Sequence, residues 1–419
     1  MSVITATDVE KVNGVLVIAS KDIVTPLAAD RAKELGVKIE RAAKTSTPFI
    51  SDRDPSAAAK RTRAAGSPAE VLRPSALPPP AATQSGALYR RGASVPPAIL
   101  PDQSANAAAT AAKPFAAVIG AGHVGAMTAL RLAETPLFAR IALIDIVPGL
   151  AAGLALDMWH SASIRGFTTR IEGGIDLSAI MGADYVVVTA GKPRQPGMTR
   201  TDLTGVNAAI IKGVAEGIRR YAPSSVVIVV TNPLEEMTHL MAKTTGFPPQ
   251  RVAGMAGVLD AARFKSLIAL TGVARPRDIA AIALGSHGPE MVIPLSQATV
   301  NGAPLQTLLP PDQINAIVER TRDSGAEVVK LLQQGSAYFA PAESAAAMVV
   351  DMVRESDRVL AACVQSGGAY GIEDTRVGLP VRLGPGGVKE IVTLPLNSTE
   401  KAALAKAASS IAARVRELG

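Results

Sequence analysis

Residues 115–125 decide the fold, and they read Phe-Ala-Ala-Val-Ile-Gly-Ala-Gly-His-Val-Gly. The five apolar residues predict a buried strand, and a helix-forming run at 126–133 follows the glycines. Gly120, Gly122 and Gly125 therefore stand between a strand and a helix, as a dinucleotide fingerprint requires. In that setting Gly120 permits a tight turn, Gly122 lets the backbone approach a pyrophosphate, and Gly125 lets the helix pack closely on the strand.

An acidic residue supports this interpretation. Asp145 follows the next predicted strand, 141–144, and lies 20 residues after Gly125. A carboxylate at this place accepts hydrogen bonds from the ribose hydroxyls of NAD and repels the 2′-phosphate of NADP. The alternative is an ordinary strand-to-helix turn with a surface aspartate. The pattern favours an NAD site, and His123, inside the glycine-rich turn, is given no catalytic role.

Strand-like runs alternate with helix-length segments from residue 114 onward. After the first strand they lie at 141–144, 185–189 and 226–230. This alternation predicts an α/β fold with a Rossmann-type doubly wound parallel sheet. Longer helical stretches and less regular strands follow. We therefore expect an NAD-binding domain at 114–256 and an α+β substrate domain at 257–419.

The chain before this region divides into two parts. Residues 1–45 predict a small folded module, with strands at 15–18 and 37–39 and a helix at 26–35 between Pro26 and Gly36. Residues 46–113 are rich in Ala, Pro and Ser and show no sustained period. Such a segment buries too little apolar surface to offset its ordering entropy, so it predicts a disordered linker.

Composition limits the partners of the chain. The 419 residues carry a net charge of +7, but Lys and Arg are scattered among Asp and Glu, unlike the basic patch of a nucleic-acid reader. No apolar run reaches membrane-spanning length, and the N-terminus lacks the features of a signal peptide. The single cysteine, Cys363, excludes an internal disulfide and a cysteine cluster for a metal. We expect a cytoplasmic protein with no metal, nucleic acid or membrane partner.

Four further motifs follow the glycine-rich turn in order. They are Thr-Ala-Gly-Lys-Pro-Arg-Gln-Pro-Gly-Met-Thr-Arg at 189–200, Thr-Asn-Pro at 231–233, Val-Leu-Asp-Ala-Ala-Arg-Phe at 258–264 and Gly-Ser-His-Gly at 285–288. Together they resemble the motifs of the lactate/malate dehydrogenase family, and the resemblance covers residues 114–419. The first motif is closest to malate dehydrogenases of the lactate-dehydrogenase-like type. The resemblance implies NAD-dependent interconversion of malate and oxaloacetate, a small dicarboxylate pair, by a homodimer or homotetramer.

The chemistry of such a reaction explains the residue types in these motifs. A 2-hydroxy acid must exchange its hydroxyl proton with a group that titrates near neutral pH, and histidine is suited to this. His287 stands between small residues after a predicted strand at 279–284. Asp260 is its expected partner, because a carboxylate fixes the tautomer and favours the imidazolium. Arg263, three residues later, is expected to bind the substrate carboxylate through its planar fork. The alternative is a surface histidine and an aspartate at a helix start.

The resemblance assigns the other site residues as well. Asn232 is expected to bind the substrate oxygen and to order the cofactor ring. The remaining residues of the cofactor pocket are Thr189, Ala190, Gly191, Asn207 and Thr231. Ala337 is expected in the pocket wall, where its small side chain leaves room for a charged substrate group. One departure from the family pattern is Pro289, which comes between His287-Gly288 and the acidic Glu290.

Residues 192–202 contain two prolines and a glycine and predict a loop. By resemblance this loop is a mobile lid. Arg200 would polarise the substrate carbonyl, and Arg194 would bind the second carboxylate of a four-carbon substrate. The alternative is a pair of solvated loop arginines.

Three alternatives stay open from the sequence. The enzyme could act on L-lactate or another 2-hydroxy acid, although a monocarboxylate would leave Arg194 without a partner. It could also be a catalytically dead scaffold on the same fold. Residues 22–37 resemble N-terminal segments of proteins associated with bacterial microcompartments, which implies a docking module for a partner; a lineage-specific extension with no partner is the other explanation.

Overall fold

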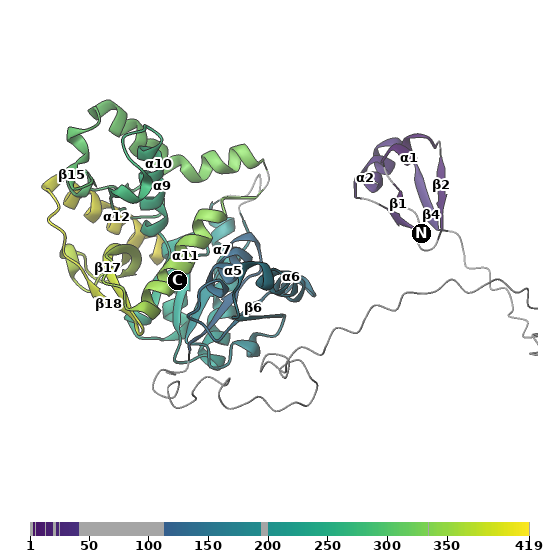
Figure 1. Cartoon of the computed structure of the whole chain (residues 1–419), viewed down its shortest axis with the longest axis horizontal. Helices are drawn as coiled ribbons and strands as arrows, with labels where there is room; N and C mark the ends of the chain where they lie inside the picture. The colour runs from purple at the N-terminus through teal and green to yellow at the C-terminus, as the bar shows by residue number, and fades with distance from the viewer. Residues whose placement is uncertain are drawn as a thin grey trace, which may run out of the picture. The chain divides into compact units, whose positions relative to one another are not determined.

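The computed structural model describes residues 3–41, apart from 5, 13, 20, 21 and 25, and residues 113–418, apart from 194–199 and 334. The chain divides into two compact units, residues 1–93 and 94–419. Figure 1 shows the described helices and strands of each unit. The predicted linker, 46–113, lies outside the described residues except for Lys113.

The N-terminal unit is a small α/β module. Its strands pair in parallel as two couples, β1 (Val3–Ile4) with β3 (Ile23–Val24) and β2 (Val15–Ile18) with β4 (Lys38–Arg41). Helices α1 (Ala6–Glu10) and α2 (Pro26–Leu35) enclose a core of Val9, Ala28, Ala32 and Val37. The sequence predicted β2 and α2 with these bounds, whereas the strand predicted at 37–39 begins one residue before β4 and ends two residues before its end. A core this small supplies little stability by itself.

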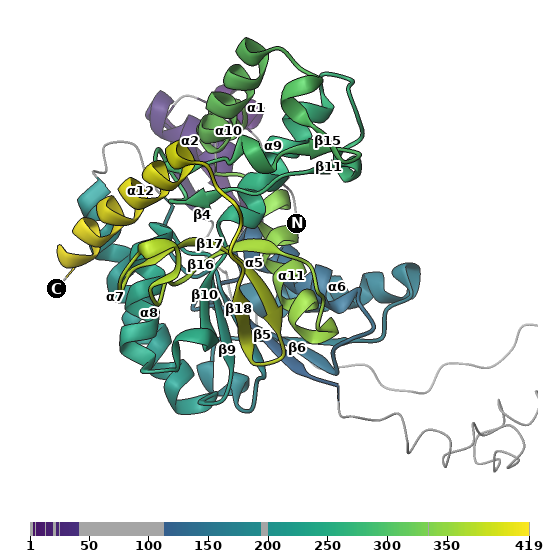
Figure 2. The same ribbon diagram turned by 90° about the vertical axis from the view of Figure 1, so that its left-hand side faces the viewer.

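The main unit is built on a sheet whose first six strands are parallel. Their spatial order is β7-β6-β5-β8-β9-β10, the doubly wound order of a dinucleotide-binding fold. Figure 2 labels four of these strands, β6, β5, β9 and β10, along the sheet. The bounds are β5 (Phe115–Ile119), β6 (Arg140–Ile144), β7 (Arg170–Gly174), β8 (Tyr185–Val188), β9 (Val226–Val229) and β10 (Val252–Gly254). This arrangement confirms the Rossmann-type sheet predicted from the alternating runs.

The sheet continues into the second half of the unit without a break. Gly254 of β10 pairs antiparallel with Cys363 of β16 (Leu360–Gln365), which in turn pairs along its whole length with β17 (Arg376–Gly384). The strands β12 (Leu284–Gly285), β13 (Met291–Val292) and β18 (Gly387–Ile391) complete an 11-stranded sheet. A separate antiparallel sheet contains β11 (Ile279–Ala280), β14 (Thr299–Val300) and β15 (Ala303–Pro304).

The single strand expected at 279–284 was wrong. The structure divides it into β11 and β12, which belong to different sheets. Ile282 and Ala283 stay buried between the two strands, so the apolar run continues where the hydrogen-bonded ladder does not. A continuous apolar run fixes burial but not strand pairing.

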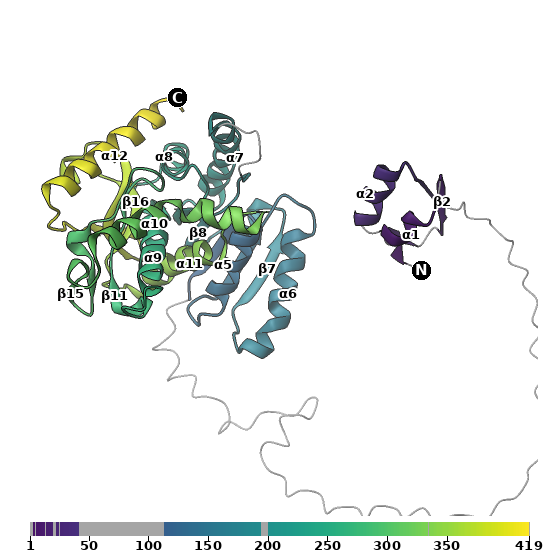
Figure 3. The same cartoon turned by 90° about the horizontal axis from the view of Figure 1, so that it is seen from above.

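Helices cover both faces of the parallel strands, because successive strand residues face opposite sides. Ala116 and Val118 belong to one core with α5 (His123–Ala133), α6 (Leu150–Arg165) and α11 (Phe339–Arg354). Ala117 and Ile119 belong to the other, with α7 (Arg200–Tyr221) and α8 (Leu234–Thr245) (Figure 3).

The other helices lie in the second half, where α10 (Pro311–Leu332) packs on α9 (Gly257–Ala269) and α12 (Ser398–Arg416) packs on α8. Short 3-10 turns occur at Leu177–Ile180, Pro249–Arg251, Pro276–Asp278, Leu295–Gln297, Leu305–Thr307 and Ala369–Gly371. Because the carboxyl ends of β5, β6, β8 and β9 meet at one edge of the sheet, the predicted site residues that follow them are brought to that edge.

Candidate active site

The glycine-rich turn after β5 leaves no room for side chains at two of its three glycines. Gly120 has a φ of +104°, and a Cβ there would lie 2.6 Å from the backbone nitrogen of Ala190. A Cβ on Gly125 would lie 1.8 Å from the carbonyl oxygen of Gly120. Gly122 faces open space and is the N-cap of α5, with no side chain capping the helix. The helix N-terminus is thus uncovered on the side where a pyrophosphate would bind.

Asp145 follows β6 and faces this turn. Its Oδ2 accepts a hydrogen bond of 2.6 Å from the backbone nitrogen of Ala121, and its Oδ1 accepts one of 3.0 Å from that of Val147. The carboxylate is therefore oriented by the turn itself, and its side chain stays partly exposed. His123 is the first residue of α5, not part of the preceding turn, and its ring lies 4.9 Å from that of Tyr338.

The predicted walls of the cofactor pocket are joined by hydrogen bonds. Thr189 Oγ1 donates to the carbonyl of Gly120 over 3.0 Å, and Thr231 Oγ1 donates to that of Ala190 over 2.7 Å. A Cβ on Gly191 would lie 2.6 Å from Thr231 Cγ2, so a larger residue there would have to displace the Thr231 side chain. These residues sit against the glycine-rich turn, and the small side chains and uncapped helix fit a dinucleotide.

Asn207 on α7 holds two loops together. Its Oδ1 accepts from the backbone nitrogen of Lys192 over 2.8 Å, and its Nδ2 donates to the carbonyl of Asn232 over 2.7 Å. Asn232, which follows β9, has an exposed side chain and precedes Pro233 through a cis peptide bond. The side chain of Asn207 therefore fixes backbone segments around the pocket.

His287, Asp260 and Arg263 are brought together as predicted. His287 Nδ1 lies 2.8 Å from Asp260 Oδ2, and Arg263 Nη1 donates to Asp260 Oδ1 over 3.3 Å. The Asp260 side chain is 2% exposed, against 15% for His287 and 16% for Arg263. Asp260 thus lies beneath the other two, whose outer atoms reach the surface. Among the described residues, the other ring nitrogen of His287 has no hydrogen-bond partner, so it can exchange a proton with a substrate.

The local charges shift the titration of the histidine. Burial lowers the pKa of His287, but attraction and hydrogen bonding by Asp260, together with the charge of Glu235, outweigh burial, so the pKa lies above its ordinary value. Repulsion by Arg263 is a smaller effect in the opposite direction. This balance favours the imidazolium that an alcohol oxidation would form.

Glu235 is a further residue of this group, and it was not predicted from the sequence. This residue is in the first turn of α8, is 3% exposed and accepts a 2.5 Å hydrogen bond from the backbone nitrogen of His287. Burial raises the pKa of Glu235, because the carboxylate loses its hydration. The signal was an acidic pair, Glu235-Glu236, directly after the Thr-Asn-Pro motif, but a helix start often carries such residues for its dipole alone.

Some predicted residues are not placed. Arg194 lies outside the described residues, and of Arg200 only the backbone, which begins α7, is described. Ala337 is half-buried beside Tyr338, next to the N-terminus of α11. Pro289 lies in the turn between β12 and β13.

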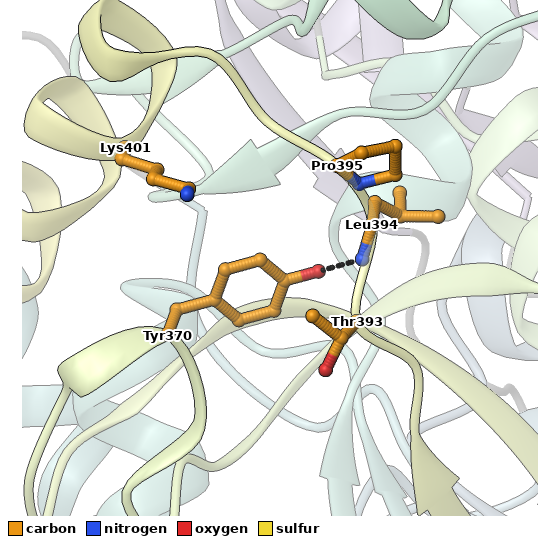
Figure 4. A pocket seen from close by; sticks show the side chains of 5 residues that line it. All are labelled: Tyr370, Thr393, Leu394, Pro395 and Lys401. Atoms are coloured by element: carbon orange, nitrogen blue, oxygen red, sulfur yellow. Dashed lines mark hydrogen bonds between the residues drawn. The ribbon is translucent and has the colours of Figure 1, made fainter.

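The described residues contain no group of three side chains able to hold a metal ion, and none of their helices is long and apolar enough to cross a membrane. A cavity of about 420 Å³ lies elsewhere, lined by Tyr370, Thr393, Leu394, Pro395 and Lys401 (Figure 4). There the Tyr370 hydroxyl accepts from Leu394 N over 2.7 Å and donates to Val392 O over 2.9 Å. These bonds tie a loop in place, and none of the predicted site residues lines this cavity.

Comparison with known proteins agrees with the geometry. Residues 116–254 match the model of the lactate/malate dehydrogenase NAD-binding domain, and residues 257–418 match that of the α/β C-terminal domain of the same family. The chain is 48% identical over 295 residues to a malate dehydrogenase of Synechocystis, covering 70% of this chain and 90% of that protein. It is 48% identical over 294 residues to one of Thermomicrobium roseum, covering 70% and 94%.

Solved structures give the same result. A malate dehydrogenase of Cryptosporidium parvum superposes with a TM-score of 0.71 at 37% identity, covering 73% of this chain and 99% of that one. A lactate dehydrogenase of the same organism, in complex with lactic acid and NAD, has a TM-score of 0.71 at 35% identity and covers 74% and 99%. With its glycine-rich turn, its histidine–aspartate pair and both halves of its catalytic unit matched, the chain belongs to the lactate/malate dehydrogenase family.

Proposed function

We propose that this chain catalyses the NAD-dependent interconversion of malate and oxaloacetate. The observation that carries the proposal is the 2.8 Å contact between His287 Nδ1 and Asp260 Oδ2, with Arg263 on the same helix. The names of the relatives support malate as the substrate, and the matched NAD-binding domain supports the cofactor.

In the proposed reaction each site residue has a separate role. When bound, NAD supplies the acceptor for the hydride that leaves C2 of malate. Neutral His287 accepts the hydroxyl proton, and Asp260 stabilises the imidazolium that results. Arg263 binds the carboxylate beside the reacting carbon. Asn232 holds the substrate oxygen, Arg200 polarises the carbonyl, and Arg194 binds the far carboxylate.

The cofactor is held by the residues around the glycine-rich turn. Gly120, Gly122 and Gly125 admit the pyrophosphate to the N-terminus of α5, and Asp145 binds the ribose. Thr189, Ala190, Gly191 and Thr231 line the nicotinamide side, with Asn207 fixing their loops. Closure of the lid over this site would exclude water.

Steady-state assays test the proposal. Oxaloacetate and pyruvate are each supplied with NADH and with NADPH, and oxaloacetate with NADH should be reduced most efficiently. Faster reduction of pyruvate would favour the lactate alternative. Absence of activity with every pair would favour the dead scaffold.

A homodimer or homotetramer is part of the proposal. Helix α6 and the segment before it expose large apolar side chains, among them Ile146 (91%), Leu156 (56%), Trp159 (43%) and Ile164 (85%). Clustered exposed apolar groups mark interaction surfaces, and a second copy of the chain is the occupant that the family supports. Replacing Trp159 with Lys should shift sedimentation towards the monomer, whereas an unchanged oligomer would exclude this surface.

The domain plan is proposed on the same basis: a docking module at 1–45, a linker at 46–113, an NAD-binding domain at 114–256 and a substrate domain at 257–419. The protein is then cytoplasmic, and the docking module would attach it to a partner such as a bacterial microcompartment component. Fractionation of cells that express the full chain, and of cells that express it without residues 1–45, tests this attachment.

A further inference from the structure

A network of charged side chains lies behind His287, and the proposed reaction gives these side chains no role. Helix α8 begins with two consecutive buried glutamates, Glu235 and Glu236. Glu235 binds the backbone N–H of His287 directly. Glu236 reaches the same turn through Arg414, which comes from the last turn of α12.

Arg414 joins three parts of the fold. Its Nε donates to Glu236 Oε1 over 2.8 Å, and one of its terminal nitrogens donates to Ser286 Oγ over 3.4 Å. The other terminal nitrogen lies 3.6 Å from Glu290 Oε2. Because Ser286 and Glu290 stand on either side of His287, one guanidinium holds both ends of the turn that carries the imidazole.

This ion pair is more shielded than an ordinary surface pair. The side chains of Arg414 and Glu236 are 17% and 3% exposed. Exposed pairs contribute little, whereas the loss of one partner of a buried pair is costly. Glu290, which follows Pro289 in the turn, faces the same guanidinium at 3.6 Å.

The charges near the imidazole come from three helices and its own turn. Asp260 and Arg263 face His287 from α9, and Glu235 faces it from α8. Glu236 and Glu290 lie beside this group, and among the described residues they are the charged groups in contact with Arg414. Removal of the guanidinium would leave these two carboxylates uncompensated behind the histidine, which favours its protonated form.

We propose that Arg414 is a positioning residue for His287. It fixes the turn 285–290 against α8 and α12 and balances the carboxylates behind the imidazole. The inference rests on the proposed function, because it concerns the proton-exchanging group, but its first test needs no turnover.

That test is an NMR titration of the full chain with labelled histidines, in which His287 is assigned by the loss of its signal in His287→Asn. Arg414→Gln should move the titration midpoint of His287 to higher pH. Arg416→Gln, which removes the same charge from an exposed position two residues away, should leave it in place. The double variant Glu236→Gln/Arg414→Gln should return the midpoint towards the wild-type value. An unmoved midpoint in Arg414→Gln overturns the proposal.

Kinetics supply the second test. In Arg414→Gln, kcat for malate oxidation should fall about tenfold, less than the ~10²-fold expected for loss of the acid–base group itself. NADH affinity should be retained, the acidic limb of the pH profile should move to higher pH, and Arg414→Lys should recover most of the activity. If kcat falls but the acidic limb of the pH profile stays in place, Arg414 only stabilises the fold, and the proposal is overturned.

Misfolding of the variant and failure of the proposed function can both be distinguished from failure of this inference. If Arg414→Gln does not fold, Glu290→Gln replaces it; loss of that carboxylate should lower the midpoint of His287, and no shift counts against the network. If the wild-type protein has no dehydrogenase activity, the proposed function fails, while the titration still decides whether Arg414 governs His287.

Discussion

We expect cofactor choice to depend on Asp145, since its carboxylate lies beside the glycine-rich turn. We expect strong preference for NADH over NADPH, because a 2′-phosphate would meet this negative charge. Asp145→Ser should weaken NADH binding and narrow the preference, as measured by kcat/KM with each cofactor. Asp312→Ser, at an exposed position on α10, is the control. Equal efficiency of the wild type with both cofactors would contradict the assignment.

We expect proton transfer to depend on His287. His287→Asn should lower turnover by at least ~10²-fold, the usual contribution of a positioned acid–base group. NADH affinity, measured by fluorescence titration, should stay near the wild-type value. His160→Asn, at an exposed position on α6, should change neither quantity. Near-normal turnover in His287→Asn would exclude this histidine as the acid.

The pH profile should carry the signature of the carboxylates around His287. Malate oxidation needs the neutral imidazole, and since the pKa of His287 is raised, the acidic limb should lie above the ordinary histidine value of about 6.5. Glu235→Gln keeps an acceptor for the backbone N–H of His287 but removes a negative charge near its imidazole. The pKa should therefore fall and the limb should move to lower pH. A limb that moves upward, or not at all, would show that Glu235 does not act on the imidazole by its charge.

The sequence predicted three side chains that the structure brings together, but it did not predict the charged residues that lie behind them. His287, Asp260 and Arg263 form one hydrogen-bonded group, as expected. Glu235 and Arg414 went unnoticed, because a glutamate in a first helical turn and an arginine in a last one have an ordinary explanation in the helix dipole. Only the fold brings α8 and α12 to the turn that carries His287.

Among the elements, the loop before α7 is expected to set substrate choice. Arg194, which lies outside the described residues, would lose its hydration on closure and needs a carboxylate partner. An unpaired buried charge costs on the order of 3–5 kcal/mol, which at ~1.4 kcal/mol per tenfold is roughly 10² to 10³ in catalytic efficiency. Pyruvate should be disfavoured against oxaloacetate by about that factor.

Arg194→Gln removes the stranded charge. Activity on oxaloacetate should fall and activity on pyruvate should rise, as measured by kcat/KM for each. A wild type that reduces both equally well would refute this role for Arg194 and the choice of malate with it.

The helices and strands that were predicted most accurately are those with the clearest pattern of apolar residues in the sequence. The strands β5, β6, β8 and β9 were found within one residue at each end, because short apolar runs between turns leave few other arrangements. The run at 279–284 was misjudged, since two strands of different sheets share one buried stretch. The composition of a segment indicates whether it is buried. It does not indicate which strand the segment pairs with, because that strand lies elsewhere in the chain.

For the whole molecule, we expect the N-terminal unit to be dispensable for chemistry. The two units separate between residues 93 and 94, and the residues of the proposed site all lie beyond 114. A chain without residues 1–112 should fold and retain kcat and KM close to those of the full protein. An insoluble or inactive truncated protein would contradict the expectation that the linker separates the N-terminal unit from the enzyme.

A doubly wound parallel sheet could be predicted at this scale, because alternating strands and helices with right-handed crossovers leave few topologies. The antiparallel continuation through β16 and β17 could not, since β10 meets β16 only through the single pair Gly254–Cys363. A contact between residues more than a hundred positions apart leaves no periodic trace in the sequence.

That single pair gives the protein a built-in reporter. Cys363 is the sole cysteine of the chain, is 0% exposed and lies at the seam where the two halves of the sheet meet. Burial raises the pKa of its thiol, so the native protein holds it in the unreactive protonated form. A thiol-reactive dye can therefore enter only when the seam opens, and its labelling rate would follow the breathing of the sheet without any engineered label.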